Sequence, residues 1–556
     1  MRRIVLLLAS IGALALGGCT RSEPEAPPPE APAAAPAADM GPAYGDTFVD
    51  ASIGDASTLL PLLATDSASH SVAGLIYNGL VKYDGEYNVI GDLAESWDIS
   101  DDNLTITFHL KKGVRFHDGA PFTARDVEYT YRVTMDPNTL TAYRGDFEPV
   151  DRVEVVDDHT VRVTYREPFA PALISWGVSM LPRHLLEGKD INTSELGRSP
   201  VGTGPYRFVE WITGQRIVLE RNPDYFEKDP ETGMRLPYLQ RYVFRIIPDL
   251  GVQFNELLAG KIDMMGLKPL QWVRQTATER FTKNYNKYKY LANAYTYLGY
   301  NLEKPMFQDM RVRRALTHAI DKQEIVDGVL LGLGVPATGP YKPGTWAYNP
   351  DVPRYPYDPQ KARALLAEAG WTDSDGDGVL DRDGKPFRFT VLTNQGNDQR
   401  LKTAEIIQQR LKAVGIRIDI RVLEWAAFIN EFVKPGKFDA VILGWTITQD
   451  PDLYDVWHSS KAVPGGLNHT HYRNPEVDDL LVRARKTFDR EERKRLYARF
   501  QEILAEDQPY TFLYVPYALV AVSNRIHGIR PAPAGITYNF ERWYVPKPLQ
   551  RHTETP

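Results

Sequence analysis

The chain has 556 residues, of which 43% are hydrophobic and 25% charged, and 65 Lys and Arg against 72 Asp and Glu give a net charge of −7. These are the proportions of a globular protein of several domains, and the slightly acidic balance disfavours a dedicated nucleic-acid binder, which is usually strongly basic. The single cysteine, Cys19, excludes an internal disulfide, a Cys-X-X-Cys redox pair and a cysteine-based zinc site.

The first residues predict a targeting segment. Two arginines precede an apolar run from Ile4 to Leu16, which is shorter than the about 20 apolar residues of a membrane span and is typical of a secretory signal peptide. The run ends in the letters LGGC, which resemble the bacterial lipobox, whose cysteine is lipidated and becomes the mature N-terminus. We therefore expect residues 1–18 to be a lipoprotein signal peptide and Cys19 to carry a lipid anchor. The alternative is an ordinary signal peptide with a coincidental cysteine.

Residues 19–44 predict a tether, because they are rich in Pro and Ala and include EPEAPPPEAPAAAPAA at 23–38. Such a stretch has no apolar periodicity to bury and stays extended and stiff. No second long apolar run follows residue 44, so we expect a water-soluble body beyond it.

The body shows the patterns of both strands and helices. Apolar and polar residues alternate over 104–110, 161–165 and 416–422, which predicts three β-strands. A helical spacing of apolar residues over 404–414 ends at Gly415, directly before the third of these strands. We therefore expect at least one α/β unit within a mixed α/β fold.

Two further helices have recognisable N-termini. Asp358 and Pro359 match an N-cap followed by a first-turn proline, and the apolar spacing runs on to Gly370. Asp489 with Glu492 matches a capping box. The apolar stripes of these helices predict core packing and indicate nothing about function.

One loop predicts a metal site. Asp373, Asp375 and Asp377 occupy positions 1, 3 and 5 of a calcium-binding loop, and Gly378 stands at position 6, where glycine permits the sharp turn. Asp381 stands at position 9, but position 12 is a glycine and not the bidentate glutamate. The loop is therefore incomplete. The pattern predicts a structural calcium ion held by the four aspartates. The alternative is a solvated acidic turn without a bound ion.

Motifs of common enzyme classes are absent. The sequence has no Gly-X-Ser-X-Gly elbow, HEXXH helix, P-loop or Gly-X-Gly-X-X-Gly turn. His458, His469 and His471 have no cysteine or carboxylate in register, and we interpret them as loop residues, not as a zinc site. We expect no enzymatic activity and no required cofactor, although scattered acid/base carboxylates would leave no motif.

A family resemblance covers most of the body. Residues 91–133, GDLAESWDISDDNLTITFHLKKGVRFHDGAPFTARDVEYTYRV, resemble the signature of bacterial solute-binding proteins of the oligopeptide/dipeptide class, family 5, which are the extracytoplasmic receptors of ABC importers. Further blocks agree in the same order: VGTGPYRFVEW (201–211), FQDMRVRRALTHAIDKQEIVDG (307–328), YDPQKARALLAEAGW (357–371), GWTITQDPDLYDVWHSS (444–460) and NPEVDDLLVRARKTFDREERKRLY (474–497).

The resemblance implies an α/β fold of the periplasmic-binding-protein type II kind, a three-lobed clamshell with an extra inserted α+β lobe. Ligand would lie between the main lobes, and closure would be a hinge motion near residues 297 and 516. The implied domains are lobe I at 45–75, 200–297 and 516–556, the inserted lobe at 76–199, and lobe II at 298–515.

The resemblance also implies a function. The protein would capture a small solute, a peptide or a peptide-like compound, and deliver it to an ABC permease with separate ATPase subunits. We expect a monomer in the periplasm or at the cell surface, held to a membrane by its lipid anchor, with no nucleic-acid partner. The alternatives are the same scaffold with a non-peptide solute, such as an oligosaccharide, an opine or a metal chelate, and an envelope-anchored enzyme.

Four candidate ligand-binding residues come from motif matches. Trp425 in LEWAAF and Trp445 in LGWTITQDPD match tryptophans that line side-chain pockets in relatives. Aromatic walls suit this role because they bury apolar area without requiring one fixed partner. Core packing is the alternative for both tryptophans. Tyr206 after VGTGP and Thr58 in STLLPL are further cleft candidates.

The segment after Trp445 departs from peptide-binding relatives, which often carry an aspartate there for the α-amine of the peptide. Ile447 and Thr448 occupy that place in this chain. A buried ammonium group needs a partner, because an unpaired buried charge is costly. Either Asp450 makes the amine contact or the ligand has no free amine, so Thr448 and Asp450 complete the candidate set.

Overall fold

Three main β-sheets organise the part of the chain that the structure, a computed structural model, describes. The signal peptide, Cys19 and most of the tether lie outside the described residues, so those predictions remain predictions. The described residues are 40–551 apart from 65, 142, 425–426, 448–449 and 464–465.

The first sheet brings distant parts of the chain together. Its order is β1-β10-β9-β8, with β1 parallel to β10 and the other pairs antiparallel. Phe48 of β1 packs in one core with Tyr242 of β10 and with Phe540 and Trp543 near the C-terminus. The beginning and the end of the body therefore share this core. Its elements are β1 (Gly45–Ser52), α1 (Ser67–Ile76), β8 (Tyr206–Ile212), β9 (Arg216–Arg221) and β10 (Leu239–Ile246).

The second sheet, β4-β5-β7-β6, is antiparallel throughout. Strands β5 and β7 confirm two of the predicted strands, and their apolar residues face a core around Trp176. Helix α2 packs against β6 and β7. The elements of this region are β2 (Val81–Tyr83), β3 (Val89–Gly91), β4 (Ala94–Ile99), β5 (Thr105–Leu110), α2 (Ala124–Met135), β6 (Val150–Asp157), β7 (Thr160–Tyr165), α3 (Ala172–Ser175) and α4 (Arg183–Leu186).

The third sheet has the order β11-β20-β13-β19-β17-β18, and β12 and β14 also pair with β20. Both faces of its centre are buried: Ile442 of β19 faces a core with α8 to α11, whereas Val441 and Leu443 face a core with α14 and α15. Its strands are β11 (Met264–Gly266), β12 (Tyr285–Leu291), β13 (Ala294–Tyr300), β14 (Gly334–Pro336), β17 (Arg388–Asn394), β18 (Arg417–Leu423), β19 (Ala440–Thr446) and β20 (Tyr510–Ser523).

The helices around the third sheet begin and end where local sequence signals predict. Asp358 caps α10 by accepting from the N–H groups of Gln360 and Lys361, and Asp489 caps α15 by accepting from Glu492 N–H. The predicted N-termini of the two helices and the α/β unit formed by α11 and β18 are confirmed, but only the Asp489 half of the predicted capping box is present, since the Glu492 side chain accepts from Arg495. The helices are α5 (Leu250–Leu258), α6 (Glu279–Asn284), α7 (Pro305–Gln308), α8 (Met310–Ala319), α9 (Lys322–Leu330), α10 (Pro359–Glu368), α11 (Asp398–Lys412), α13 (Tyr454–Trp457), α14 (Pro475–Lys486) and α15 (Arg490–Asp507), and a short hairpin pairs β15 (Asp381–Arg382) with β16 (Lys385–Pro386).

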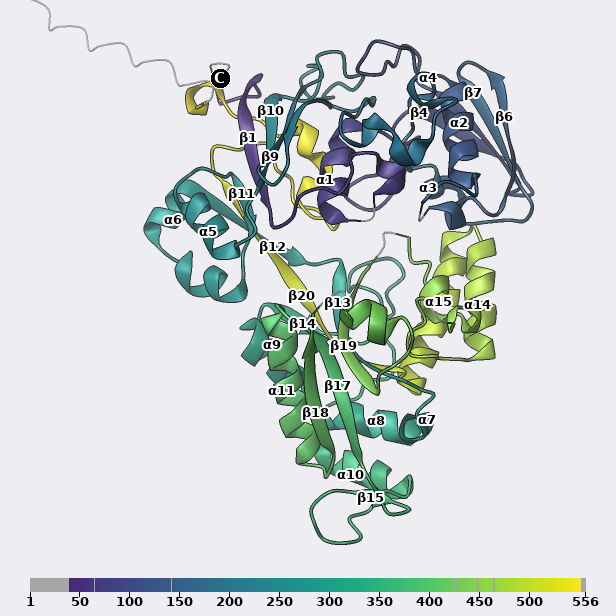
Figure 1. The fold of residues 1–556 in the computed structure, drawn as a ribbon, viewed down its shortest axis with the longest axis vertical. Coiled ribbons are helices and arrows are strands. Elements are labelled where there is room, and N and C mark those ends of the chain that lie inside the picture. The colour runs from purple at the N-terminus through teal and green to yellow at the C-terminus, as the bar shows by residue number, and fades with distance from the viewer. Residues whose placement is uncertain are drawn as a thin grey trace, which may run out of the picture. The chain divides into compact units, whose positions relative to one another are not determined.

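Strand β20 belongs to two parts of the molecule. Up to Pro516 it pairs with β13 and β14, and from Tyr517 onwards it pairs with β12 and β11. The chain crosses between the same two parts a second time in the turn from β12 to β13. Figure 1 shows β20 running obliquely from β12 towards β13 and β14. The body is thus an α/β fold in which β20 and the β12–β13 turn join the first-sheet region to the third sheet.

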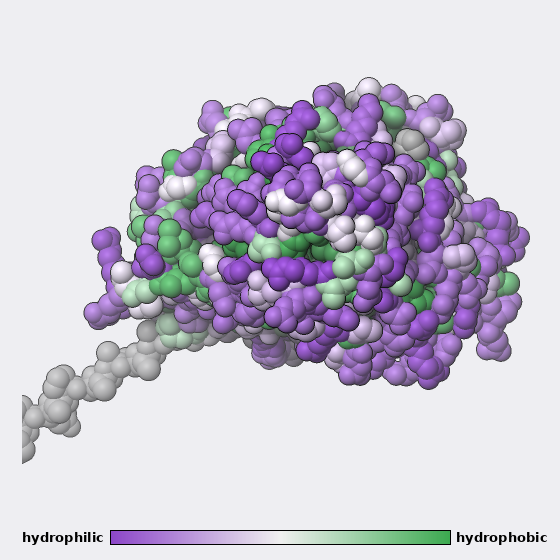
Figure 2. All heavy atoms as spheres, turned by 90° about the horizontal axis from the view of Figure 1, so that it is seen from below, coloured by the Kyte–Doolittle hydropathy of each residue, from purple (hydrophilic) through white to green (hydrophobic). Residues whose placement is uncertain are grey.

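Membrane-spanning helices were sought in the part of the chain that the structure describes. None of the helices within the described residues is long and apolar enough to cross a membrane. Figure 2 shows the face opposite the first two sheets, where hydrophilic side chains predominate and hydrophobic ones lie in separate small patches. This face therefore does not present a broad apolar surface.

Candidate functional site

A small enclosed cavity lies where segments of all three predicted lobes meet. Tyr87 reaches it from the β2–β3 turn, Asn293 from the β12–β13 turn, and Ile447 and Pro451 from the segment after β19. Its volume is about 20 Å³, which holds about one water molecule, whereas small-molecule sites usually measure roughly 300–1,000 Å³. A solute can therefore occupy this place only when its walls move apart. The other lining residues are Tyr341, Thr345, Trp346 and Ala347.

One wall of the cavity is held by a polar cluster. The hydroxyl of Tyr87 lies 2.9 Å from the side-chain oxygen of Asn293 and 2.9 Å from the carbonyl oxygen of Pro533. Lys342 Nζ donates to the same two oxygens, at 2.6 and 3.0 Å. Burial lowers the pKa of Lys342. This cluster ties the β2–β3 turn, the β12–β13 turn and the C-terminal segment to the loop after β14.

The acidic segment after β19 is engaged by arginines. Arg493 on α15 donates to both carboxylate oxygens of Asp450, at 2.9 and 3.2 Å, and also to the hydroxyl of Tyr497 at 3.1 Å. The Arg493 side chain is 9% exposed and that of Asp450 20% exposed. Arg485 on α14 donates to Asp452 at 2.7 Å. Asp450 therefore faces an arginine, which matters for the question of the ligand amine.

The second-sheet region touches α14 directly. The backbone N–H of Ala170 donates to the carbonyl oxygen of Arg485 at 2.5 Å, and Lys486 pairs with Glu167 at 2.7 Å. Asp146 also faces this segment, and its pKa is raised by burial and then by the nearby carboxylates of Asp455 and Asp452. The second-sheet region and α14, which belong to the predicted inserted lobe and the predicted lobe II, are thus in contact.

Trp445, near the end of β19, is partly buried and packs against other rings. Its ring stacks on His469 with centroids 5.6 Å apart and planes 9° apart, and its indole N–H donates to the hydroxyl of Tyr510 at 3.4 Å. Burial lowers the pKa of His469 to about 4, so this histidine is neutral at pH 7. His469 is therefore a packing partner of the candidate tryptophan.

The remaining candidates are dispersed. Tyr206 is 0% exposed and lies in the core of the first sheet beside Tyr242 and Phe540. Thr58 is half-buried, and its hydroxyl accepts from the N–H of Leu60. Trp425 and Thr448 lie outside the described residues. The structure thus brings Trp445 and Asp450 to one region, at the end of β19, and places Tyr206 in a core.

Sequence reasoning missed Tyr87, Asn293, Lys342 and Arg493. Each of them acts through a partner far away in the sequence, such as Arg493 through Asp450. The only local signal was the Asp489 N-cap of α15, four residues before Arg493. Such a signal predicts where the helix begins, but it does not predict that Arg493 contacts Asp450.

The predicted calcium loop has a partial fit. Asp373, Asp375 and Asp377 each place a carboxylate oxygen within 4.8 Å of the others, and all three residues are exposed. Asp381 turns instead to Ser374, whose N–H and hydroxyl donate to it at 2.9 and 2.7 Å. Carboxylate oxygens are the ligands that calcium prefers. Three of the four predicted ligands can therefore hold a cation together.

Comparisons with known proteins cover nearly the whole chain. The model of the bacterial extracellular solute-binding proteins, family 5, matches residues 88–465. The oligopeptide-binding protein AppA of Bacillus subtilis is 38% identical over 517 residues, which cover 91% of this chain and 93% of that protein. The solved structure of B. subtilis AppA in complex with a nonapeptide has a TM-score of 0.78 at 36% identity, covering 91% of this chain and 100% of that one. NikZ from Campylobacter jejuni in complex with Ni(L-His) has a TM-score of 0.78 at 29% identity, covering 90% and 99%.

Proposed function

The chain belongs to family 5 of the bacterial extracellular solute-binding proteins, and from that premise we propose that it captures a peptide or peptide-like solute and delivers it to the permease of an ABC importer. The observation that carries this proposal is the 38% identity, over 91% of the chain, to an oligopeptide-binding protein. Such a receptor needs only to bind and release its solute, so no catalytic group is required.

Binding would take place at the enclosed cavity between the lobes. Trp346 and Tyr341 supply aromatic walls there, and Ile447 supplies an apolar one. Because the cavity is far smaller than a peptide, the ligand would enter an open form in which the contacts of α14 with Glu167 and Ala170 are broken. Closure would then remake these contacts around the solute.

The contact of Asp450 with Arg493 bears on the choice of ligand. A carboxylate that already accepts from a guanidinium group on both oxygens is poorly placed to receive an ammonium group as well. This supports a mode of binding in which Asp450 does not contact an amine of the ligand. A peptide bound mainly through its backbone and side chains, or one with a blocked N-terminus, would meet that condition.

A metal chelate is the second candidate. It is favoured by the likeness to NikZ, which was solved with Ni(L-His), at the same TM-score as the peptide complex. The aromatic walls of the cavity suit a compact chelate as well as a peptide side chain.

The finer features complete the proposal. A lipid on Cys19 would hold the body at a membrane surface through the Pro/Ala-rich tether, since anchoring by two or more acyl chains is stable. The protein would act as a monomer in the periplasm or at the cell surface. A calcium ion bound by Asp373, Asp375 and Asp377 would be structural.

The test is ligand-induced stabilisation of the purified protein. Matched peptide libraries with free and with acetylated N-termini, and Ni(L-His), are compared by thermal unfolding. A ligand at about 100 times its Kd adds about 2.7 kcal/mol to the free energy of unfolding. We expect stabilisation by both peptide libraries, lost in Trp346→Ala and kept in Trp272→Ala, a tryptophan that does not line the cavity. Stabilisation by Ni(L-His) alone would identify the ligand as a metal chelate and not a peptide. Absence of stabilisation by all of these solutes would contradict the proposal.

A further inference from the structure

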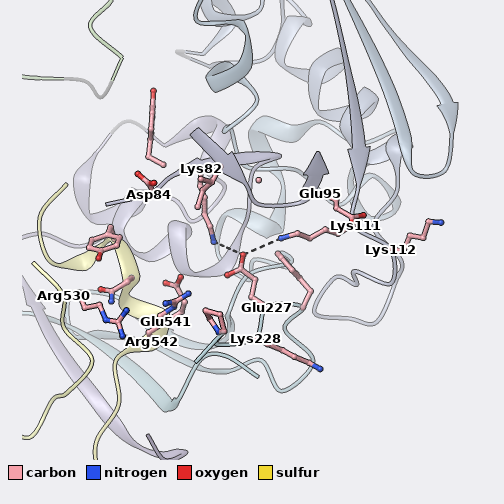
Figure 3. Close-up of a pocket in the computed structure, with 17 residues that line it drawn as sticks. Lys82, Asp84, Glu95, Lys111, Lys112, Glu227, Lys228, Arg530, Glu541 and Arg542 are labelled. Atoms are coloured by element: carbon pink, nitrogen blue, oxygen red, sulfur yellow. Dashed lines mark hydrogen bonds and ion pairs between the residues drawn. The ribbon is translucent and has the colours of Figure 1, made fainter. Parts of the chain in front are cut away.

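A second and much larger cavity is lined by the β2–β3 hairpin, whose turn also contributes Tyr87 to the cavity between the lobes. Its volume is about 830 Å³, and the two cavities share no lining residue. It opens between the β2–β3 and β4–β5 hairpins on one side and two segments of the first-sheet region, 226–230 and 530–542, on the other (Figure 3). This volume lies within the range of small-molecule sites.

The inner charges of this cavity satisfy one another. Glu227 lies 3.0 Å from Lys82 Nζ and 3.7 Å from Lys111 Nζ, as the dashed lines of Figure 3 mark. Lys82 also pairs with the buried Asp92 at 3.3 Å. Glu541 lies near Lys82 as well, and its pKa is raised by burial and lowered by that lysine. Lys82 and Lys111 thus each already have a carboxylate partner, so the inner charges of the cavity hold one another in place.

The cations nearer the mouth are different. Lys112 and Lys228 are exposed and Arg542 is half-buried, and within the described residues none of the three has an ion-pair partner. Figure 3 shows Lys112 and Lys228 on one side of the cavity and Arg542 on the other. The lining carries six basic and four acidic side chains in a chain whose net charge is −7. Two of the basic residues have carboxylate partners just outside the lining, Lys82 in Asp92 and Arg530 in Glu231, so the positive charge that an incoming anion would meet is that of the three mouth cations.

Aromatic rings also line the cavity. Tyr83, Phe226 and Tyr538 line the cavity, and Lys111 Nζ lies 4.8 Å from the centroid of the Phe226 ring. A flat apolar group can bury its faces against such rings, while an acidic substituent reaches the mouth. Inorganic anions would use only the second of these features.

We propose that this cavity binds a small organic anion that carries a flat apolar part, of the class of aromatic carboxylates. The carboxylates contact either Lys112 and Lys228 on one side of the cavity or Arg542 on the other, and Phe226 and Tyr538 contact the ring. The site shares no lining residue with the cavity between the lobes, although the Tyr83 ring of the larger cavity lies edge-on to the Tyr87 ring of the smaller one, with centroids 6.4 Å apart.

The test uses ¹⁹F NMR of the purified protein with 4-fluorophthalate as the probe and 4-fluorobenzylammonium as a cation of similar ring size. The triple variant Lys112→Gln, Lys228→Gln, Arg542→Gln removes the mouth cations. The matched control Lys361→Gln, Lys402→Gln, Lys494→Gln removes three exposed cations elsewhere. All six residues are exposed or half-buried, and both triples should fold.

We expect saturable broadening of the 4-fluorophthalate signal with a Kd on the order of 1 mM. The mouth triple should weaken this binding about tenfold, because each exposed charge contact contributes up to about 1 kcal/mol, and the control triple should leave it unchanged. Absence of saturable broadening, equal losses in the two triples, or equal binding of 4-fluorobenzylammonium would each overturn the proposal.

Discussion

Lys342 Nζ lies 2.6 Å from the side-chain oxygen of Asn293, in the turn where the chain passes from β12 to β13. The same ammonium group reaches the carbonyl oxygen of Pro533, so one buried cation joins the loop after β14 to both the crossing turn and the C-terminal segment. Motion at this turn has to break or carry along these contacts. The lysine is thus placed to control how readily the lobes separate.

Lys342→Met should lower the free energy of unfolding by about 1–3 kcal/mol, because it removes the ammonium donor from two buried oxygens, of which the single hydroxyl proton of Tyr87 can serve only one. Urea unfolding measures the loss. Lys361→Met, at an exposed position on α10, is the control and should change stability by less than about 0.5 kcal/mol. Equal effects of the two substitutions would remove the special role given to Lys342.

Arg493→Met should destabilise more than Asp450→Asn, and the double variant should recover part of the loss. The arginine is nearly buried, and its removal leaves the carboxylate of Asp450 without a guanidinium partner. A double-mutant cycle should give a coupling of about 1–3 kcal/mol. The exposed pair Arg495–Glu492 on the same helix is the control and should give less than about 1 kcal/mol. A coupling no larger than that of the control would mean that Asp450 is free to meet a ligand.

Asp50→Asn should gain stability relative to the parent protein as the pH rises. Burial raises the pKa of Asp50 from 3.8 to about 6, although Tyr242 donates to it at 2.8 Å. The folded-state pKa lies above that of the unfolded chain, so ionised Asp50 destabilises the fold; the cost is absent below about pH 4 and complete above about pH 6.

The stability difference between Asp50→Asn and the parent should therefore grow by about 3 kcal/mol between these pH values. Chemical denaturation at several pH values checks this. Asp101→Asn, an exposed control, should show a flat difference. A flat profile for Asp50→Asn as well would show that Asp50 ionises in the folded protein as it does in the unfolded chain.

Calcium should stabilise the protein weakly through the acidic loop. With a Kd of roughly 1 mM, as in extracellular calcium modules, about 10 mM calcium would add about 1.4 kcal/mol. Asp375→Asn should abolish the calcium-dependent shift in Tm, whereas Asp383→Asn, just beyond the three converging carboxylates, should keep it. A Tm shift that is equally large with magnesium, or that persists in Asp375→Asn, would indicate general charge screening and not calcium binding at this loop.

Cys19→Ser should release the protein from the membrane fraction with its ligand binding intact, because a serine cannot be lipidated at this position. Fractionation followed by immunoblotting measures the distribution. Substitution of Ser22 by alanine, three residues farther along the tether, is a suitable control and should leave the protein anchored. Retention of the Cys19→Ser protein would refute the lipid anchor.

Much of the fold could be predicted because its signals are local. The N-cap and first-turn proline of α10 act within one turn, and so does the Asp489 cap of α15. Strands β5 and β7 follow from alternation, since one face of their sheet is buried. Sheet order is not a local property, and only the family resemblance indicated that β1 and the C-terminal segment share a core.

The candidate site was less predictable for a physical reason. Trp445 could be proposed from its motif, yet nothing near it in the sequence shows that His469 stacks on it. Asp450 could be placed beside the ligand as well as beside an arginine, because a carboxylate suits both partners. Its partnership with Arg493 depends on how α15 packs against the segment after β19, which no spacing reveals.

The position of strand β20 also determines how the protein unfolds. One uninterrupted strand supplies hydrogen bonds to β13 and β14 and then to β11 and β12. Unfolding of the part that contains β13 and β14 therefore also removes strand pairing from the part that contains β11 and β12, and the reverse holds as well. Heat should therefore melt both in a single calorimetric transition, and a protease cut between Pro516 and Tyr517 should cost the whole molecule its cooperativity. The strand that joins the two parts should therefore also make their unfolding cooperative.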